Sequence, residues 1–221
     1  MARVPFQDRA QAGSLLAEEL KPYARKRDTI ILALVRGGVA IGAALRDALG
    51  LPLYPYIVRK LGHPLHREYG LGAIAEGGAT YLDEDAMRMM EATWEDLEPV
   101  IEEETAEMER RKSAYLTSAR PPLKGKTVIL TDDGAATGGT MLAAIQDVRA
   151  QGVKKVIVAL PVSPLDTERA FEKQADEVSI LANPEPFEAV GKWYRDFPQL
   201  TDEDVITLLQ KDSVLARPTI H

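Results

Sequence analysis

The chain alternates between short, almost wholly apolar runs and longer segments whose apolar residues recur with helical spacing. A short continuous apolar run is typical of a strand buried on both faces. Such runs predict strands at residues 29–35, 127–130, 153–160 and 177–181. Helical spacing predicts helices at residues 8–26, 39–49, 140–150, 165–173 and 201–209. This order of strands and helices predicts an α/β fold, with a parallel twisted sheet flanked by helices.

Prolines and glycines interrupt this pattern between residues 51 and 82. Residues 51–58 are β-prone, and Pro52 and Pro55 indicate an edge strand, because proline cannot donate a hydrogen bond to a neighbouring strand. The glycine-rich residues 59–78 are predicted to form a loop. Residues 79–82 are then expected to close a small hairpin.

Residues 84–117 form a long charged stretch with helical periodicity, in which Pro99 predicts the start of a second helix. Its apolar positions form one stripe: Met87, Met90, Trp94, Leu97, Ile101, Met108 and Tyr115. Two interpretations fit, a helix pair packed on the core or a coiled coil that joins two copies of the chain. Glu104 and Arg111 interrupt the apolar seam, which favours the helix pair.

A chain of 221 residues with 45% hydrophobic and 28% charged residues is typical of one large globular domain. We therefore expect a single domain over residues 1–221. Its expected parts are a core at about 5–182, a helical insertion at about 84–118, a small C-terminal hood at about 183–200 and a C-terminal helix at about 201–211.

The charge balance narrows the classes of partner. The chain has 27 Lys and Arg against 34 Asp and Glu, a net charge of −7, which disfavours nucleic acids and anionic membrane surfaces. A small anionic ligand in a local basic pocket remains compatible with it. The absence of cysteine excludes disulfides and thiolate chemistry. Because the first residues show no signal peptide and no apolar run approaches the ~20 residues of a membrane span, we expect a cytoplasmic protein.

The most informative segment is VILTDDGAATGGT, at residues 128–140. A predicted strand runs into Asp132 and Asp133, and a small-residue loop then leads into a helix. Backbone amides at a helix N-terminus bind anions, and threonine hydroxyls add donors. The candidate phosphate-binding residues are Gly134, Ala135, Ala136, Thr137, Gly138, Gly139 and Thr140. The carboxylates would repel an adjacent phosphate, but one sugar ring away they can accept hydrogen bonds from a vicinal diol, which predicts a ribose-5-phosphate site.

Three alternatives account for less of this segment. A Walker A loop requires a lysine that is absent here, and a Rossmann loop requires a different glycine spacing. A simple tight turn explains the glycines, but it leaves the paired carboxylates and the two threonines unexplained.

The segment resembles the signature with which type I phosphoribosyltransferases bind 5-phosphoribosyl-1-pyrophosphate (PRPP). Residues 30–42, IILALVRGGVAIG, resemble the pyrophosphate loop of that family, which implies pyrophosphate binding by Arg36, Gly37 and Gly38. Residues 57–64 resemble the start of its flexible catalytic loop, which implies that Arg59 and Lys60 meet pyrophosphate oxygens.

The tail at residues 190–197 resembles the hood that covers the nucleobase in many relatives. Trp193 and Tyr194 are the candidates for stacking on a base, and packing within the hood is the alternative for each ring. Ala136 stands where enzymes for 6-oxopurines usually have Asp, so the loop is closer to those of adenine and uracil enzymes.

The resemblance implies a glycosyltransferase of the pentosyltransferase class. It would move the 5-phosphoribosyl group between PRPP and a nitrogenous base or related small acceptor, with release of pyrophosphate. Asp132 and Asp133 would hold the ribose hydroxyls, directly or through Mg²⁺ that is bound mainly by the substrate. A homodimer is compatible with the sequence. The alternative function is a non-catalytic PRPP sensor or regulator on the same fold.

Overall fold

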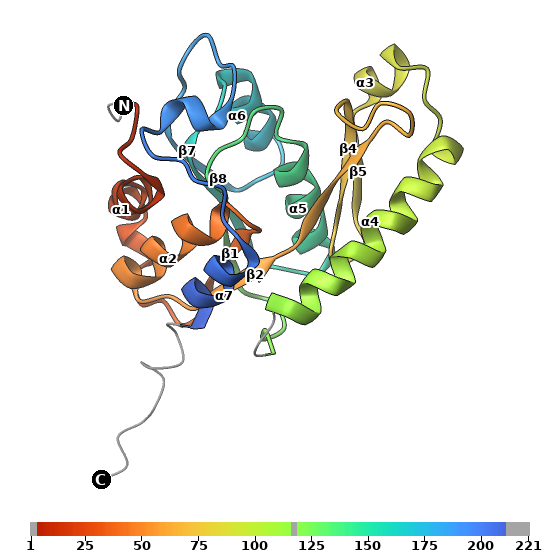
Figure 1. Cartoon of the computed structure of the whole chain (residues 1–221). Helices are drawn as coiled ribbons and strands as arrows, with labels where there is room; N and C mark the ends of the chain where they lie inside the picture. Colours follow the sequence, from red (N-terminus) through yellow and green to blue (C-terminus); the bar gives the residue numbers. More distant parts are fainter. Residues whose placement is uncertain (1–3, 116–118, 211–221) are drawn as a thin grey trace.

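The computed structural model describes residues 4–115 and 119–210 and confirms the α/β prediction (Figure 1). Within those residues, a five-stranded parallel sheet has the order β2-β1-β6-β7-β8. Its strands are β1 (Thr29–Leu34), β2 (Leu53–Tyr56), β6 (Thr127–Thr131), β7 (Lys155–Val162) and β8 (Glu177–Ala182). β2 lies at one edge, as Pro52 and Pro55 predicted.

Helices cover both faces of this sheet because its central strands are apolar on both sides. Ile31 and Ile129 pack with α1 (Arg9–Glu19), α2 (Gly38–Leu49) and α7 (Asp202–Gln210). Leu32 and Leu130 point the opposite way and pack with α5 (Gly139–Ala150) and α6 (Leu165–Glu172). Alternate residues of one strand therefore serve two different cores.

The first helix is shorter than predicted. The Asp8 side chain accepts a hydrogen bond from the Gln11 amide at 2.8 Å, which caps α1. The helix ends at Glu19 instead of residue 26, and a 3₁₀ turn, Lys21–Tyr23, follows. Pro22 has no amide hydrogen to continue the α-helical ladder, so the chain leaves the helix there.

The prediction of a loop at residues 59–78 was wrong. The segment contains β3 (Val58–Gly62) and β4 (Gly70–Ala75), which form an antiparallel sheet with β5 (Thr80–Leu82) in the described part of the chain. A Cβ on Gly72 would lie 2.1 Å from the Tyr81 carbonyl oxygen. The glycine permits a close approach of two strands within a sheet, whereas in the sequence alone glycine indicates a loop. The hairpin expected at residues 79–82 is confirmed by the pairing of β5 with β4.

The charged insertion forms two helices, α3 (Glu84–Met89) and α4 (Trp94–Tyr115), but Pro99 lies inside α4 instead of starting it. The missed start signal is Thr93, whose amide and hydroxyl donate to the Asp96 carboxylate at 2.8 and 2.7 Å. Leu97 and Met108 of the predicted stripe pack on the β3-β4-β5 sheet together with Val100. Trp94, also predicted to be apolar core, is exposed, and Tyr115 packs in the core that α1, α2 and α7 share. The ends predicted at residues 117–118 and 211 lie outside the described residues.

No helix among the described residues combines the length and apolar character needed to cross a bilayer.

Candidate active site

The acid pair and the first glycine-containing loop meet at the carboxyl ends of the adjacent strands β1 and β6. Gly37 packs so closely that a Cβ on it would lie 2.0 Å from Asp133 Oδ2. A Cβ on Gly38 would lie 2.7 Å from the Thr131 carbonyl oxygen. The two sequence motifs predicted to contact one ligand therefore share one location, and glycine is what permits their contact.

Both acidic residues are partly buried. Burial raises the pKa of Asp132, and the neighbouring charge of Asp133 raises it further. Burial also raises the pKa of Asp133, while the positive charge of Arg9 opposes that rise. The pair is thus an electrostatically strained site that one cation partly relieves, as is common where carboxylates serve a ligand.

Arg9 is a site residue that sequence reasoning missed. Its Nε donates to Asp133 Oδ2 at 2.8 Å, and its Nη1 donates to the Pro198 carbonyl at 2.8 Å. Its guanidinium lies 3.8 Å from the centre of the Phe197 ring. No local pattern in the sequence indicates this role, because Arg9 opens α1 and lies 124 positions from Asp133.

The loop after the acid pair is fixed in shape and leaves its amides free. Gly134 and Gly138 have φ of 155° and 80°, and a Cβ on Gly138 would lie 2.7 Å from the Thr167 side chain. The Thr167 hydroxyl donates to the Ala136 carbonyl at 2.7 Å, and the Ala135 amide donates to the Val162 carbonyl at 3.1 Å. The amides of residues 136–140 form no hydrogen bond with any described residue. Together with the start of α5, these amides can receive an anion.

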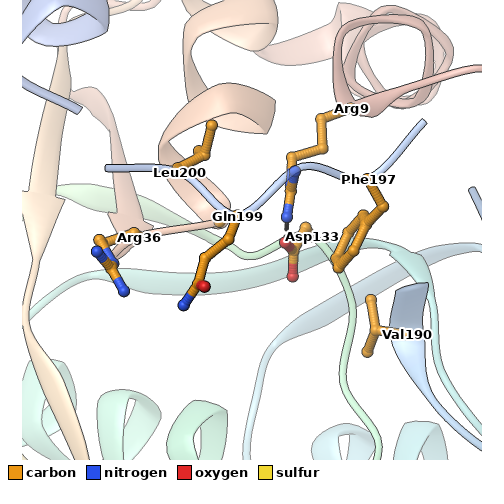
Figure 2. Close-up of a pocket in the computed structure, with 8 residues that line it drawn as sticks. Arg9, Arg36, Asp133, Val190, Phe197, Gln199 and Leu200 are labelled. Carbon is orange, nitrogen blue, oxygen red and sulfur yellow. Dashed lines mark hydrogen bonds and ion pairs between the residues drawn. The ribbon is translucent and has the colours of Figure 1, made fainter. Parts of the chain in front are cut away.

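A pocket of about 500 Å³ opens beside the acid pair (Figure 2). In this view the Gln199 side chain lies between those of Arg36 and Asp133, and all three line the pocket. The lining residues come from α1, the first loop, the acid pair and the C-terminal segment: Arg9, Arg36, Gly37, Asp133, Val190, Phe197, Gln199 and Leu200. The Val35–Arg36 peptide bond is cis. Arg36 of the first loop and Asp133 of the acid pair line the same pocket.

Arg59 and Lys60 line a second pocket of about 480 Å³, which shares no lining residue with the pocket beside the acid pair. Arg59 Nε donates to Glu104 of α4 at 2.6 Å. Lys60 Nζ donates to the Glu68 carbonyl at 3.1 Å, and its strand position pairs through Ala73 with Tyr81. Neighbouring strand residues face opposite sides of a sheet, so Arg59 faces the insertion while Lys60 shares a face with Tyr81.

The position of Tyr81 connects this sheet to the phosphate loop. A Cβ on Gly139 would lie 3.7 Å from the Tyr81 ring, which places the ring against the start of α5. Lys60 therefore lies on the face of the sheet that packs toward the phosphate loop. The two cations were treated as one pair in the sequence, and the fold gives them different surroundings.

The hood rings pack against protein. Tyr194 is buried between Phe6 and Phe197, with ring centres 5.7 and 4.9 Å away, and its hydroxyl donates to the Asp133 carbonyl at 2.5 Å. Trp193 packs on Phe187 at 6.0 Å. Both rings lie outside the lining of the pocket, which supports the packing interpretation of the hood aromatics.

Glu76 has a structural role. Its buried carboxylate accepts the Ile57 amide at 2.8 Å and pairs with Arg120 at 2.6 Å. The described residues contain no group of three or more side chains suited to holding a metal ion by themselves. Of the acid pair, Asp133 lines the pocket, so its carboxylate is accessible from that space.

Comparison with known proteins gives three findings. Residues 7–192 match the model of the phosphoribosyl transferase domain. A provisionally named phosphoribosyl transferase, found in two strains of Mycobacterium tuberculosis, is 38% identical over 207 residues, covering 93% of this chain and 46% of that protein. The crystal structure of TT1426 from Thermus thermophilus matches with a TM-score of 0.77 and 38% identity, covering 93% of this chain and 98% of that one. The chain thus spans about half the length of its mycobacterial relatives.

Proposed function

The chain belongs to the phosphoribosyl transferase domain family, and on this premise we propose that it transfers the 5-phosphoribosyl group of PRPP to a nitrogenous base or related acceptor. One observation carries the proposal: the acid pair, the free amides of residues 136–140 and the Arg36–Gly37 loop meet at one edge of the sheet. A phosphorylated sugar that also bears pyrophosphate presents a diol and two anions with matching chemistry.

Each group has a task in this reaction. The free loop amides, with Thr137 and Thr140, bind the 5-phosphate. Asp132 and Asp133 accept hydrogen bonds from the ribose hydroxyls, and Arg36 with the amides of its loop binds pyrophosphate. Mg²⁺, held mainly by substrate phosphate oxygens, would neutralise the charge of the leaving group.

The bond from the anomeric carbon to pyrophosphate oxygen breaks, and a bond from that carbon to an acceptor nitrogen forms. Pyrophosphate leaves with the bonding electrons, and the acceptor nitrogen releases its proton to water or to an oxygen of the departing pyrophosphate. The sugar becomes positively charged as the bond breaks, so the negative charge of the acid pair beside it favours that state over the ground state.

The pocket beside Arg36 and Asp133 is the proposed acceptor site. Val190, Phe197 and Leu200 give it an apolar wall, and the Gln199 amide supplies both a donor and an acceptor. Ala136 in the loop favours acceptors other than 6-oxopurines.

Two experiments test the proposal. The first is calorimetry of Mg²⁺–PRPP binding to the double variant Asp132→Asn/Asp133→Asn, with Asp85→Asn on exposed α3 as the matched control. The proposal expects binding to be lost in the double variant and retained in the control. Unchanged affinity in the double variant would show that the site is elsewhere.

The second experiment measures pyrophosphate release from Mg²⁺–PRPP with a panel of free bases, and the reverse reaction with nucleoside monophosphates. Release with at least one acceptor supports transfer. Binding of PRPP without release for every acceptor would favour the alternative, a PRPP sensor on the same fold.

A further inference from the structure

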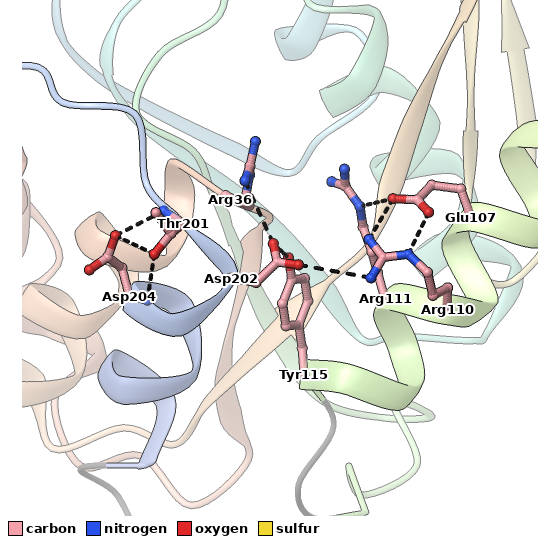
Figure 3. A network of polar contacts seen from close by, with 8 residues as sticks. All are labelled: Arg36, Glu107, Arg110, Arg111, Tyr115, Thr201, Asp202 and Asp204. Atoms are coloured by element: carbon pink, nitrogen blue, oxygen red, sulfur yellow. Dashed lines mark hydrogen bonds and ion pairs between the residues drawn. The ribbon is translucent and has the colours of Figure 1, made fainter.

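Arg36 is linked to the C-terminal helix. Its Nη1 lies 3.6 Å from Oδ1 of Asp202, the first residue of α7 (Figure 3). Both side chains are partly exposed, at 30% and 40%. The guanidinium that borders the acid-pair pocket therefore has a carboxylate partner on an element that the PRPP motifs do not include.

Asp202 is itself held by the helical insertion. Tyr115, the last residue of α4, is buried and donates its hydroxyl to Asp202 Oδ1 at 2.5 Å. Burial, with the adjacent Asp202 carboxylate, raises the pKa of Tyr115 to about 12, so the phenol keeps its proton at neutral pH. Arg110 of α4 lies 3.9 Å from the other Asp202 oxygen.

The remaining charges of this cluster pair among themselves. Glu107 accepts from Arg110 at 2.6 and 2.8 Å and from Arg111 at 2.8 Å. Figure 3 shows this group on the α4 side of Tyr115, with Arg36 on the α7 side. Asp202 lies between the two groups and is the acid in contact with Arg36.

We propose that Asp202, held by Tyr115, is a positioning residue that aims Arg36 at the pyrophosphate of PRPP, so that α4 and α7 become part of the pyrophosphate site. The inference rests on the proposed function. An arginine side chain has high rotamer entropy, and a side chain that is ordered before binding loses less of it on binding. A guanidinium has five N–H donors, so a contact through Nη1 leaves others for phosphate oxygens.

An opposite effect is also physically reasonable, and its sign makes the test decisive. A carboxylate close to an anion site repels the anion and competes for the arginine. If repulsion or competition dominates, removing the Asp202 charge tightens binding. If positioning dominates, the same change weakens binding.

The experiment measures the affinity of Mg²⁺–PRPP, and separately of inorganic pyrophosphate with Mg²⁺, by calorimetry. Asp202→Asn is expected to weaken both about two- to fivefold, the range of a partly exposed ion pair. Tyr115→Phe, which keeps the buried ring, is expected to weaken them in the same direction by less. Asp202→Glu should restore part of the loss.

The matched control is Glu203→Gln. Glu203 lies in the first turn of the same helix, where it is exposed and, among the described residues, forms no ion pair with Arg36. Its variant removes one negative charge from the same turn and should leave both affinities unchanged. In an Arg36→Gln background, Asp202→Asn should cause no further loss, because the group that it positions is gone.

The outcomes separate the two proposals. Unchanged or tighter binding by Asp202→Asn overturns the positioning role, as does an equal loss in the Arg36→Gln background. If Asp202→Asn does not fold, unchanged binding by Tyr115→Phe overturns it. Failure of the wild-type protein to bind either ligand would instead refute the proposed function, and the inference would fall with it.

Discussion

Gly37→Ala tests whether the first loop and the acid pair work as one unit. The new methyl group would lie 2.0 Å from Asp133 Oδ2 and 2.5 Å from its Cγ. Non-bonded carbon contacts are optimal near 3.5–4.0 Å, so the carboxyl group must move by at least about 1 Å. That movement stretches its 2.8 Å contact with Arg9 and takes Asp133 away from the sugar hydroxyls.

The expected effect follows from the size of that displacement. A misplacement of about 1 Å in a catalytic site can reduce turnover about 10²-fold, which corresponds to about 2.7 kcal/mol. We expect an effect of that order on Mg²⁺–PRPP affinity in calorimetry and on the rate of pyrophosphate release. The fold should survive, because the methyl group meets a side-chain end and no main-chain atom closer than 3 Å.

A background variant shows whether Asp133 transmits the effect. In an Asp133→Ala protein the obstructing carboxyl group is gone, so adding Gly37→Ala should change the residual affinity little. An affinity of the single variant within threefold of wild type would refute the reasoning, since it would mean that the carboxyl position is unimportant. An equal loss in both backgrounds would locate the damage elsewhere in the loop.

Three further predictions concern the acid pair, the phosphate loop and a buried carboxylate of α5. Because the pKa of Asp132 is raised in the folded protein, stability falls as pH rises above the unfolded value of about 3.9. Asp132→Asn should therefore raise Tm relative to wild type at pH 7 and change it little at pH 3, and an equal shift in Tm at both pH values would contradict this. At Gly139→Asp the new Cβ would lie 3.7 Å from the Tyr81 ring, so the side chain fits, but it puts a carboxylate among the free amides. Calorimetry should therefore show a loss of Mg²⁺–PRPP affinity of about a hundredfold or more, and retained affinity would exclude the loop as the phosphate site. Asp147 is buried and accepts hydrogen bonds from the Tyr56 hydroxyl and, at 3.0 Å, from the Gly77 amide. Asp147→Ala should therefore lower the free energy of unfolding by about 3 kcal/mol in urea titration, and a loss below about 1 kcal/mol would contradict this.

The central sheet and the two loops on it were predictable because their signals are local. Apolar runs such as that of β6 can only be buried on both faces, and the strand, acid pair and glycine loop of residues 128–140 follow one another directly. The spatial meeting of Arg36 with Asp133 follows from β1 and β6 being neighbours, which the motifs imply together and neither implies alone.

The misses have physical causes of two kinds. The strands within residues 59–78 were not predicted because their glycines serve close packing. Without those strands, the sequence could not predict that Arg59 and Lys60 face opposite sides of a sheet. Arg9 and Asp202 escaped because their partners lie far along the chain, so no spacing rule connects them with the site.

The contacts that hold Asp133, made by Arg9, Tyr194 and Pro198, have a consequence for the synthesis of the protein. These residues come from opposite ends of the described chain: Arg9 from the start, and Tyr194 and the Pro198 carbonyl from near the end. Ribosomes deliver β1, β6 and both loops well before residue 194. A nascent chain with a formed sheet therefore has Arg9 but lacks two later contacts, that of the Tyr194 hydroxyl with the Asp133 carbonyl and that of the Pro198 carbonyl with Arg9. Ligand binding should therefore appear only in chains long enough to include residues 194–198, and binding to chains truncated before residue 194 would contradict this.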